Sequence, residues 1–305
     1  MNARVEHLIA DHRTAYLRCL LLVLCGLLVL SAAAAQNSKQ SQTESRFASL
    51  DGARISYQSY GKGREALVLV HGWTCSVSYW SDLIPDLSKR SRVIAIDLPG
   101  HGQSDKPQLP YTMDLFARAV DAVLKDAGVN RVVLVGHSMG TPVARQFYRK
   151  YPQKTLAIVI VDGSLRPFGD KKIVDGMMAS LRGPNYKEAG AQMLAGMAGP
   201  NLAPELRERI QTSFLNTPQH VIVSAMEGMF DESIWGPDKI NVPVLAILAK
   251  SPFWPPDTEQ FDRSIAPNLD FQMWDGVGHF LMMERPKEFD RAVIAFLDKN
   301  ALLKK

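Results

Sequence analysis

One serine, Ser138, stands in a pattern that suits nucleophilic chemistry. It lies between Gly136 and Gly140, in the stretch VGHSMGTP, where an apolar run ends and an amphipathic pattern begins. Small residues on both sides relieve crowding in a tight strand-to-helix turn that exposes a hydroxyl above a sheet. Free N–H groups at the start of the following helix would face negative charge that develops on a substrate. The pattern therefore predicts a nucleophilic serine.

A serine hydroxyl is a weak nucleophile unless a base removes its proton, and His279 is well placed to be that base. It follows the last strand-like run of the chain, in the stretch GVGHFLMMERP, where Gly276 and Gly278 permit a tight loop. No spacing of Cys and His residues resembles a metal site, and this chemistry needs neither a metal nor an organic cofactor. None is expected.

Buried strand patterns alternate with helical patterns along the chain. The elements that they predict must position Ser138 and His279. Continuous Val, Ile and Leu runs separated by helices indicate a parallel sheet that is covered on both faces. The strand-like runs begin at residues 65, 91, 131, 155, 242 and 269, a helix is expected at about 77–90, and Asp51-Gly52 predicts a hairpin turn. The predicted fold class is α/β, with a mostly parallel, doubly wound sheet.

The N-terminal segment has the order of a secretory signal. Arginines precede an apolar run that ends in small residues, so residues 1–35 are predicted to be a signal peptide that is cleaved after Ala35. The expected location is then exported, either periplasmic or secreted, with no stable membrane span. An uncleaved membrane anchor is the alternative. The polar residues 36–46 follow as a predicted linker.

The rest of the chain divides into a body and a helical insertion. Residues 47–163 and 241–305 carry the strand patterns, whereas residues 164–240 show helical patterns, many methionines and no convincing strand. An insertion after a strand is most simply a helical cap over the carboxyl ends of the sheet, where such sheets bind ligands.

Charge and cysteine content exclude some classes of function. The net charge of the chain is only +4, and no run of Lys and Arg with interleaved aromatic residues occurs, so no nucleic-acid partner is expected. Cys75 is the one cysteine that remains after residue 35, which excludes an internal disulfide in the mature chain. The oligomeric state is left open.

Four motifs together resemble the α/β-hydrolase fold superfamily, in its serine-nucleophile, capped and esterase-like form. They are HGW (71–73), DLPGHGQSD (97–105), GHSMG (136–140) and GVGHFLMMERP (276–286), and they occur in the order typical of that superfamily. The resemblance implies that the backbone N–H groups of Trp73 and Met139 form an oxyanion hole. It also implies that His71 braces a loop and does no chemistry.

The acid that would orient His279 is where the sequence departs from the resemblance. Relatives commonly carry it shortly after the strand that corresponds to VPVLAILA, but here Pro252 stands near that position. Asp162, directly after the strand LAIVIV, is the preferred candidate, because some relatives place the acid there. Asp257 is the alternative, although an aspartate at that position could simply cap a helix.

These residues predict an exported serine hydrolase of the Ser-His-Asp type, most simply a carboxylic ester hydrolase that forms an acyl-enzyme. A small or medium hydrophobic substrate is favoured by a group of apolar residues expected near the site: Trp73, Phe230, Trp235, Phe253, Trp254, Met177, Met178, Met193, Met197, Met226 and Met229. A carbon–carbon bond hydrolase, a lactonase and a perhydrolase would use the same residues. A ligand-binding protein of this fold with low turnover is a further alternative.

Overall fold

The structure is a computed structural model that describes residues 45–167, 169, 171–200 and 202–303. The predicted signal peptide (1–35) lies outside these residues, and so does the predicted linker as far as residue 44. Arg46, the last residue of that linker, already belongs to the first strand.

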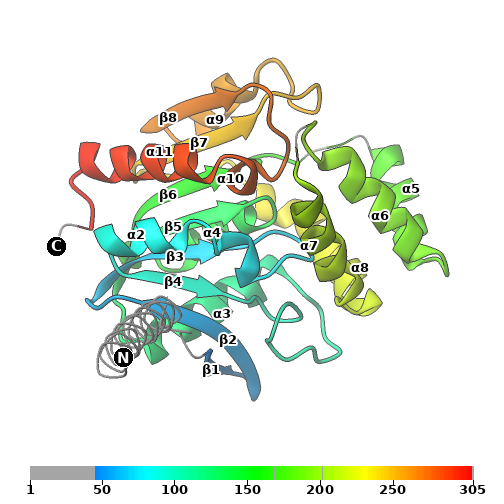
Figure 1. The fold of residues 1–305 in the computed structure, drawn as a ribbon, viewed down its shortest axis with the longest axis horizontal. Coiled ribbons are helices and arrows are strands. Elements are labelled where there is room, and N and C mark those ends of the chain that lie inside the picture. Colours follow the sequence, from blue (N-terminus) through cyan, green and yellow to red (C-terminus); the bar gives the residue numbers. More distant parts are fainter. Residues whose placement is uncertain (1–44, 168, 170, 201, 304–305) are drawn as a thin grey trace, which may run out of the picture. The chain divides into compact units, whose positions relative to one another are not determined.

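In the described part of the chain, eight strands form one sheet in the order β1-β2-β4-β3-β5-β6-β7-β8 (Figure 1). The strands from β4 to β8 in this order are parallel, whereas β2 pairs antiparallel with both β1 and β4. Their bounds are β1 Arg46–Leu50, β2 Ala53–Tyr60, β3 Glu65–Val70, β4 Val93–Ile96, β5 Arg131–His137, β6 Thr155–Val161, β7 Val244–Ala249 and β8 Leu269–Trp274. The predicted α/β class with a mostly parallel sheet is confirmed.

The hairpin predicted at Asp51-Gly52 joins β1 to β2. Both residues have positive φ, 50° for Asp51 and 86° for Gly52, as a two-residue turn of type I′ requires.

Helices cover both faces of the sheet, as the continuous apolar strands require. In Figure 1, α2 and α11 lie in front of the sheet and α3 lies behind it, packed against α4. The bounds of the helices of the body are α2 Ile84–Arg90, α3 Met113–Asp126, α4 Gly140–Lys150, α9 Thr258–Ile265, α10 Leu281–Glu284 and α11 Pro286–Lys299, with short 3₁₀ helices η1 Val77–Trp80 and η2 Pro152–Lys154. The single helix expected at about 77–90 is therefore two, η1 and α2. Pro85, in the first turn of α2, would clash with the preceding helical turn if one helix ran through.

Among the described residues between β6 and β7 lie four α-helices, which we call the inserted helices. They are α5 Lys171–Arg182, α6 Tyr186–Met197, α7 Pro204–Leu215 and α8 Gln219–Phe230, followed by the 3₁₀ helix η3 Glu232–Trp235. The described residues of 164–240 contain no strand, as their pattern suggests, and the helices gather at one side of the sheet in Figure 1. The exact limits at residues 163 and 240 stay a prediction.

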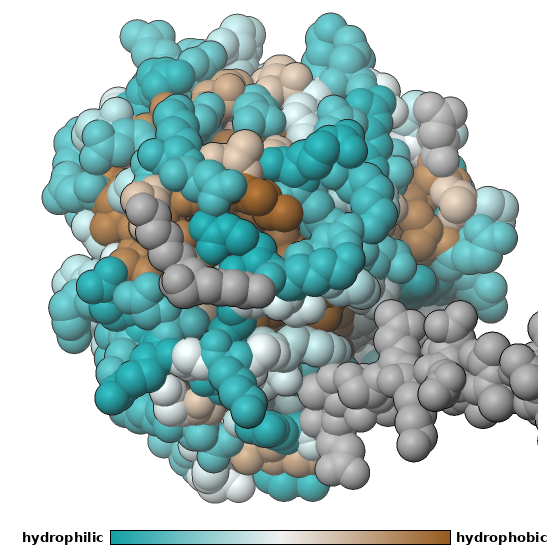
Figure 2. All heavy atoms as spheres, turned by 60° about the vertical axis from the view of Figure 1, so that its left-hand side comes forward, coloured by the Kyte–Doolittle hydropathy of each residue, from teal (hydrophilic) through white to brown (hydrophobic). Residues whose placement is uncertain are grey.

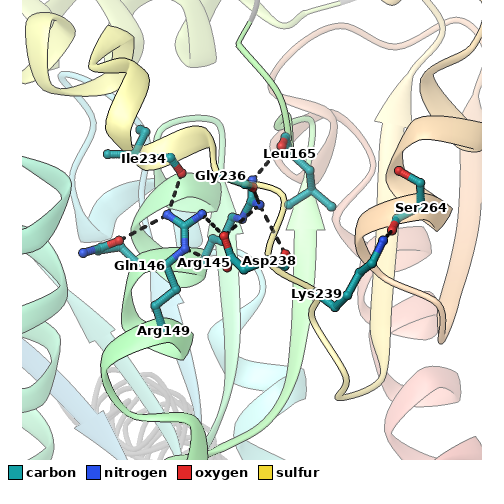
Figure 3. Close-up of polar contacts among 9 residues, drawn as sticks. All are labelled: Arg145, Gln146, Arg149, Leu165, Ile234, Gly236, Asp238, Lys239 and Ser264. Carbon is teal, nitrogen blue, oxygen red and sulfur yellow. Dashed lines mark hydrogen bonds and ion pairs between the residues drawn. The ribbon is translucent and has the colours of Figure 1, made fainter.

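Two arginines of α4 hold both chain connections of the inserted helices (Figure 3). Arg145 is 1% exposed, and its guanidinium donates to the carbonyl of Leu165 at 2.7 Å and to the carbonyl of Gly236. Arg149 donates to the carbonyl of Ile234 at 2.6 Å and pairs with Asp238. Burial lowers the pKa of Arg145 to about 10, so this side chain is still charged at neutral pH. Both ends of the insertion are thus tied to the helix that follows Ser138.

The surface is that of an ordinary globular protein on the face shown in Figure 2. Hydrophilic residues predominate there, and hydrophobic residues gather only in small areas. Across the described residues, no helix is both long enough and apolar enough to cross a membrane.

Candidate active site

Ser138 occupies a strained turn between β5 and α4. Its φ is 53°, its backbone N–H donates to Val161 O at 2.9 Å, and its carbonyl accepts from Thr141 N at 2.9 Å. A Cβ added at Gly136 would lie 2.3 Å from Gly140 O, and one at Gly140 would lie 2.3 Å from Val70 O. Both glycines are therefore required by space, and they let the turn hold the serine in a conformation that is rare for this residue type.

His279 lies in the loop between β8 and α10 and is held on two sides by groups of the sheet. Its Nδ1 is 2.6 Å from Oδ2 of Asp162, and its carbonyl accepts from Nε2 of His137 at 2.9 Å. Because the carboxylate only accepts, Nδ1 of His279 carries the proton. Nε2 of His279 is then the nitrogen that is free to accept a proton.

Asp162 directly follows β6 and is firmly fixed. Its φ is 43°, its backbone N–H donates to Ile247 O at 2.9 Å, and its Oδ1 accepts from Ala249 N at 2.7 Å. One carboxylate oxygen thus binds the neighbouring strand while the other binds His279. The position of Asp162 at the end of β6 thus orients its carboxylate toward His279.

Asp257, the alternative acid, has a different partner. Arg166 binds both of its carboxylate oxygens, at 3.0 and 2.7 Å, and the Asp257 side chain is 56% exposed. This guanidinium holds the pKa of the Asp257 carboxyl below its usual value. The structure brings Asp162 to His279, and it does not bring Asp257 there.

The loop of Trp73 passes close to Ser138, because a Cβ at Gly72 would lie 3.0 Å from Cβ of Ser138. Trp73 is anchored by its indole N–H, which donates to Ile222 O in α8 at 2.8 Å. Among the described residues, the backbone N–H groups of Trp73 and Met139 have no hydrogen-bond acceptor. Two backbone donors without an acceptor therefore lie next to Gly72 and next to Ser138 in the chain, and their role as an oxyanion hole stays a prediction.

His71 braces this loop, as expected. Its Nδ1 donates to Gly72 O at 2.8 Å, and its Nε2 accepts from Leu98 N at 3.0 Å. Burial lowers the pKa of His71 to about 4 and that of His101, which stacks near it, to about 3. Both rings are neutral at physiological pH and serve structure.

Ser138, His279 and Asp162 all line one cavity of about 320 Å³, between the carboxyl ends of the strands and the inserted helices. Its walls are mainly apolar, and they include residues that the sequence predicts there: Trp73, Trp235, Phe253, Trp254, Met177, Met193, Met197, Met226 and Met229. Phe230 and Met178 do not line it, so these two predictions are wrong: Met178 packs in the core and Phe230 packs against it. Such volume and polarity suit a small or medium hydrophobic ligand.

Charged groups are scarce in this cavity. Apart from the His279 and Asp162 pair, Lys250 is the charged residue that lines it, and its Nζ pairs with Asp275 at 2.9 Å. Among the described residues, no group of three or more His, Cys, Asp and Glu side chains is arranged to hold a metal ion.

Two parts of the wall were not expected from the sequence. Cys75 lies in the cavity, where burial raises the pKa of its thiol to about 12, so it stays protonated. Ala198, Gly199 and Pro200, which follow α6, also line the cavity, and the carbonyl of Met197 at the end of α6 accepts from the backbone N–H of His279. The stretch AGMAGP signals a turn, but nothing in it indicates where that turn packs.

Comparison with known proteins supports the resemblance. A family model described as the alpha/beta hydrolase fold matches residues 65–197. An uncharacterized protein of Mycobacterium tuberculosis is 36% identical over 116 residues, which are 38% of this chain and 34% of that protein. The chain thus spans about a third of the length of the first curated relatives that it matches.

Two further proteins are similar over most of the chain. A 2-hydroxy-6-oxononadienedioate/2-hydroxy-6-oxononatrienedioate hydrolase of Burkholderia vietnamiensis is 27% identical and is matched over 91% of its length, with 80% of this chain covered. The solved structure of Est816, described as an N-acyl homoserine lactone degrading enzyme, is 27% identical with a TM-score of 0.72, and the match covers 82% of this chain and 100% of Est816. The family match, the topology of the sheet and these neighbours show that the chain has the α/β-hydrolase fold.

Proposed function

We propose that the protein is a serine hydrolase that cleaves a carboxylic ester through an acyl-enzyme. One observation carries the proposal: the ring of His279, held by Asp162 at 2.6 Å, lines the same apolar cavity as Ser138 in its strained turn. Nucleophile, base and orienting acid in one mainly apolar pocket are the parts that acyl transfer needs.

In the first half of the reaction, Ser138 Oγ attacks the ester carbonyl and Nε2 of His279 takes its proton. The N–H groups of Trp73 and Met139 stabilise the oxyanion, each by about 3–4 kcal/mol in the transition state. Asp162 keeps the His279 ring in the tautomer that can accept this proton, and it stabilises the imidazolium. The C–O bond then breaks, and the alcohol leaves with the proton from His279.

In the second half, water replaces the alcohol. Nε2 of His279 removes a proton from the water, whose oxygen attacks the acyl carbonyl, and collapse of the oxyanion releases the acid and restores Ser138. The cycle balances without a metal or an organic cofactor.

The cavity favours an uncharged, hydrophobic acyl group of small or medium size. Its volume of about 320 Å³ is at the lower end for ligand pockets, and methionines form much of its wall. Thioether side chains adapt to ligand shape, so we expect a range of acyl chains to be accepted with one clear optimum.

Hydrolysis of p-nitrophenyl esters from acetate to long acyl chains tests the proposal. We expect turnover by the wild-type protein, and a loss of more than about 10⁴-fold in Ser138→Ala. A fluorophosphonate should label Ser138 in the wild-type protein and not in that variant. A folded wild-type protein that is neither labelled nor active would refute the hydrolase mechanism and favour the ligand-binding alternative.

A lactonase is the second candidate, because a lactone is a cyclic ester and Est816, whose fold is similar, is described as acting on one. Carbon–carbon bond cleavage is less suited to this cavity. The Burkholderia vietnamiensis relative is named for dicarboxylate substrates, whereas the cationic residue lining this cavity is Lys250, which is paired with Asp275. Homoserine lactones in the same assay series separate lactonase from esterase, and hydrogen peroxide as acyl acceptor tests for perhydrolase activity.

We further propose that the protein is exported, on the pattern of residues 1–35 alone. Cell fractionation and N-terminal sequencing of the mature chain test this. A chain that begins after Ala35 in the periplasm or medium is expected. A chain of full length in the membrane fraction would favour the anchor.

A further inference from the structure

The segment between α6 and α7 makes direct backbone contact with the loop that carries His279. The carbonyl of Met197, the last residue of α6, accepts from the backbone N–H of His279 at 3.0 Å. This hydrogen bond joins an inserted helix to the residue that the proposed function uses as its base. We call residues 197–199 the 197–199 turn.

Two glycines, Gly199 and Gly278, allow the two backbone segments to pack directly against each other. A Cβ at Gly278 would lie 2.1 Å from Gly199 N, and a Cβ at Gly199 would lie 2.6 Å from Gly278 N. Glu284 fills the adjacent space, because its Oε1 accepts from Gly278 N at 2.9 Å and its Oε2 would lie 2.2 Å from a Cβ at Gly199. Neither glycine can gain a side chain unless the His279 loop or the turn moves.

The turn is itself held in place from α7. Arg207 donates through Nη2 to Gly199 O at 3.3 Å and through Nε to Leu202 O at 3.3 Å, and Leu202 N donates to Gly199 O at 3.3 Å. The contact with the His279 loop is therefore part of an organised segment.

We propose that the 197–199 turn is a positioning element for His279 in the hydrolase reaction, an inference that rests on the proposed function. His279 is held at three points: Nδ1 by Asp162, the carbonyl by His137 and the backbone N–H by Met197. The first two come from the sheet, and the third comes from the inserted helices. The position of Nε2 over the cavity thus depends on both parts of the molecule.

Gly199→Ala is the informative substitution, because its Cβ must push the turn and the His279 loop apart. A displacement of about 1 Å can cost about 10²-fold in rate, so we expect kcat to fall at least about tenfold while KM changes little. Gly176→Ala in α5 is the matched control, since a Cβ there meets nothing within 4 Å, and its kinetics should equal wild type. Arg207→Gln, a milder change, should show the same pattern with a smaller loss.

The dependence of the rate on the leaving group distinguishes a positioning role of the 197–199 turn from a merely structural one. His279 must protonate a poor leaving group such as an alkoxide, whereas p-nitrophenolate leaves without that help. The deficit of Gly199→Ala should therefore be larger for alkyl esters than for p-nitrophenyl esters. An equal deficit for all leaving groups, with a lowered melting temperature, would overturn the proposal, and so would wild-type kinetics in folded Gly199→Ala.

Failure of the proposed function can be told apart from failure of this inference. If the wild-type protein cleaves no ester but reacts with a fluorophosphonate, the rate of Ser138 labelling still reports on the base. Slower labelling of Gly199→Ala than of Gly176→Ala would support the positioning role, and equal rates would overturn it.

Discussion

The sheet and the inserted helices hold the candidate site in different ways. Around Ser138 the backbone has no spare room, because a Cβ at Gly136 or Gly140 would lie 2.3 Å from a carbonyl oxygen. In the inserted helices, Gly176 and Gly196 face open space, although Gly190 and Gly228 are tightly packed. The helices contribute mainly methionine side chains to the cavity, whereas the sheet contributes the serine, the aspartate and the loop of the histidine.

This difference suggests that the sheet determines the rate of the reaction and that the inserted helices determine which substrate is accepted. Ser138 and Asp162 stand at the ends of neighbouring parallel strands, where a shift of the backbone would break hydrogen bonds of the sheet. Methionines of the inserted helices can adjust to ligands of different shape without such a cost. Rate should therefore respond most to changes in the sheet, and preference for acyl chains should respond most to changes in the inserted helices.

The largest expected effect tests the sheet side of the comparison. Asp162→Asn keeps the shape of the side chain but removes its charge, so the tautomer of His279 that accepts a proton loses its support. We expect kcat to fall about 10³- to 10⁴-fold, with little change in KM. The p-nitrophenyl ester series measures both constants.

Asp257→Asn is the matched control for that substitution. Asp257 binds Arg166 at the surface, so the variant should stay within about threefold of wild type in kcat. A large loss in Asp257→Asn together with near-normal Asp162→Asn would mean that the pair seen in the structure is not the one that works.

The next effect concerns the joint between the two regions. Arg145→Met removes the donors that bind the carbonyls of Leu165 and Gly236, and it leaves those groups without a partner. We expect a loss of about 3–5 kcal/mol in the free energy of unfolding, measured by urea denaturation. Arg149→Met should cost less, because Arg149 is partly exposed and, besides Gln146 of its own helix, binds only the segment after α8, at Ile234 and Asp238.

The part of the Arg145→Met variant that unfolds first shows how Arg145 stabilises the protein. If the inserted helices lose protection from hydrogen exchange while the sheet keeps it, Arg145 is a joint between two units. Loss of protection everywhere at once would instead mean that body and insertion form one cooperative unit.

The sequence predicts best where local pattern and chemistry coincide. Strand periodicity indicates the α/β class, which the structure confirms, and the glycines around Ser138 indicate its turn from the sequence alone. The single helix expected at about 77–90 is two helices, because Pro85 does not allow one helix to continue through it. The apolar spacing that predicts one helix takes no account of this proline. The catalytic roles of Ser138 and His279 stay predictions.

Contacts between distant segments are what the sequence could not supply. Asp162 and Asp257 both lie beyond the carboxyl end of a strand near His279, and only their side-chain partners distinguish them: Asp162 contacts His279, whereas Asp257 pairs with Arg166. Arg166, which binds Asp257, gives no local sign of that role. The bond between Met197 and His279 likewise joins segments whose proximity depends on the path of α6 across the cavity.

The smallest expected effect tests the open space around Gly176 in α5. Gly176 is exposed within α5 and its φ is not positive, so Gly176→Ala removes backbone freedom from the unfolded chain without strain in the folded one. We expect the free energy of unfolding to rise by about 0.5–1 kcal/mol in urea denaturation. If the insertion unfolds with the body, this gain appears in the global transition. If α5 opens on its own, the gain appears only in the hydrogen exchange of α5, and the midpoint of global unfolding does not move. A destabilised variant would contradict the open space seen around Gly176. In open space and with a helical φ, an added methyl group causes neither a steric clash nor backbone strain.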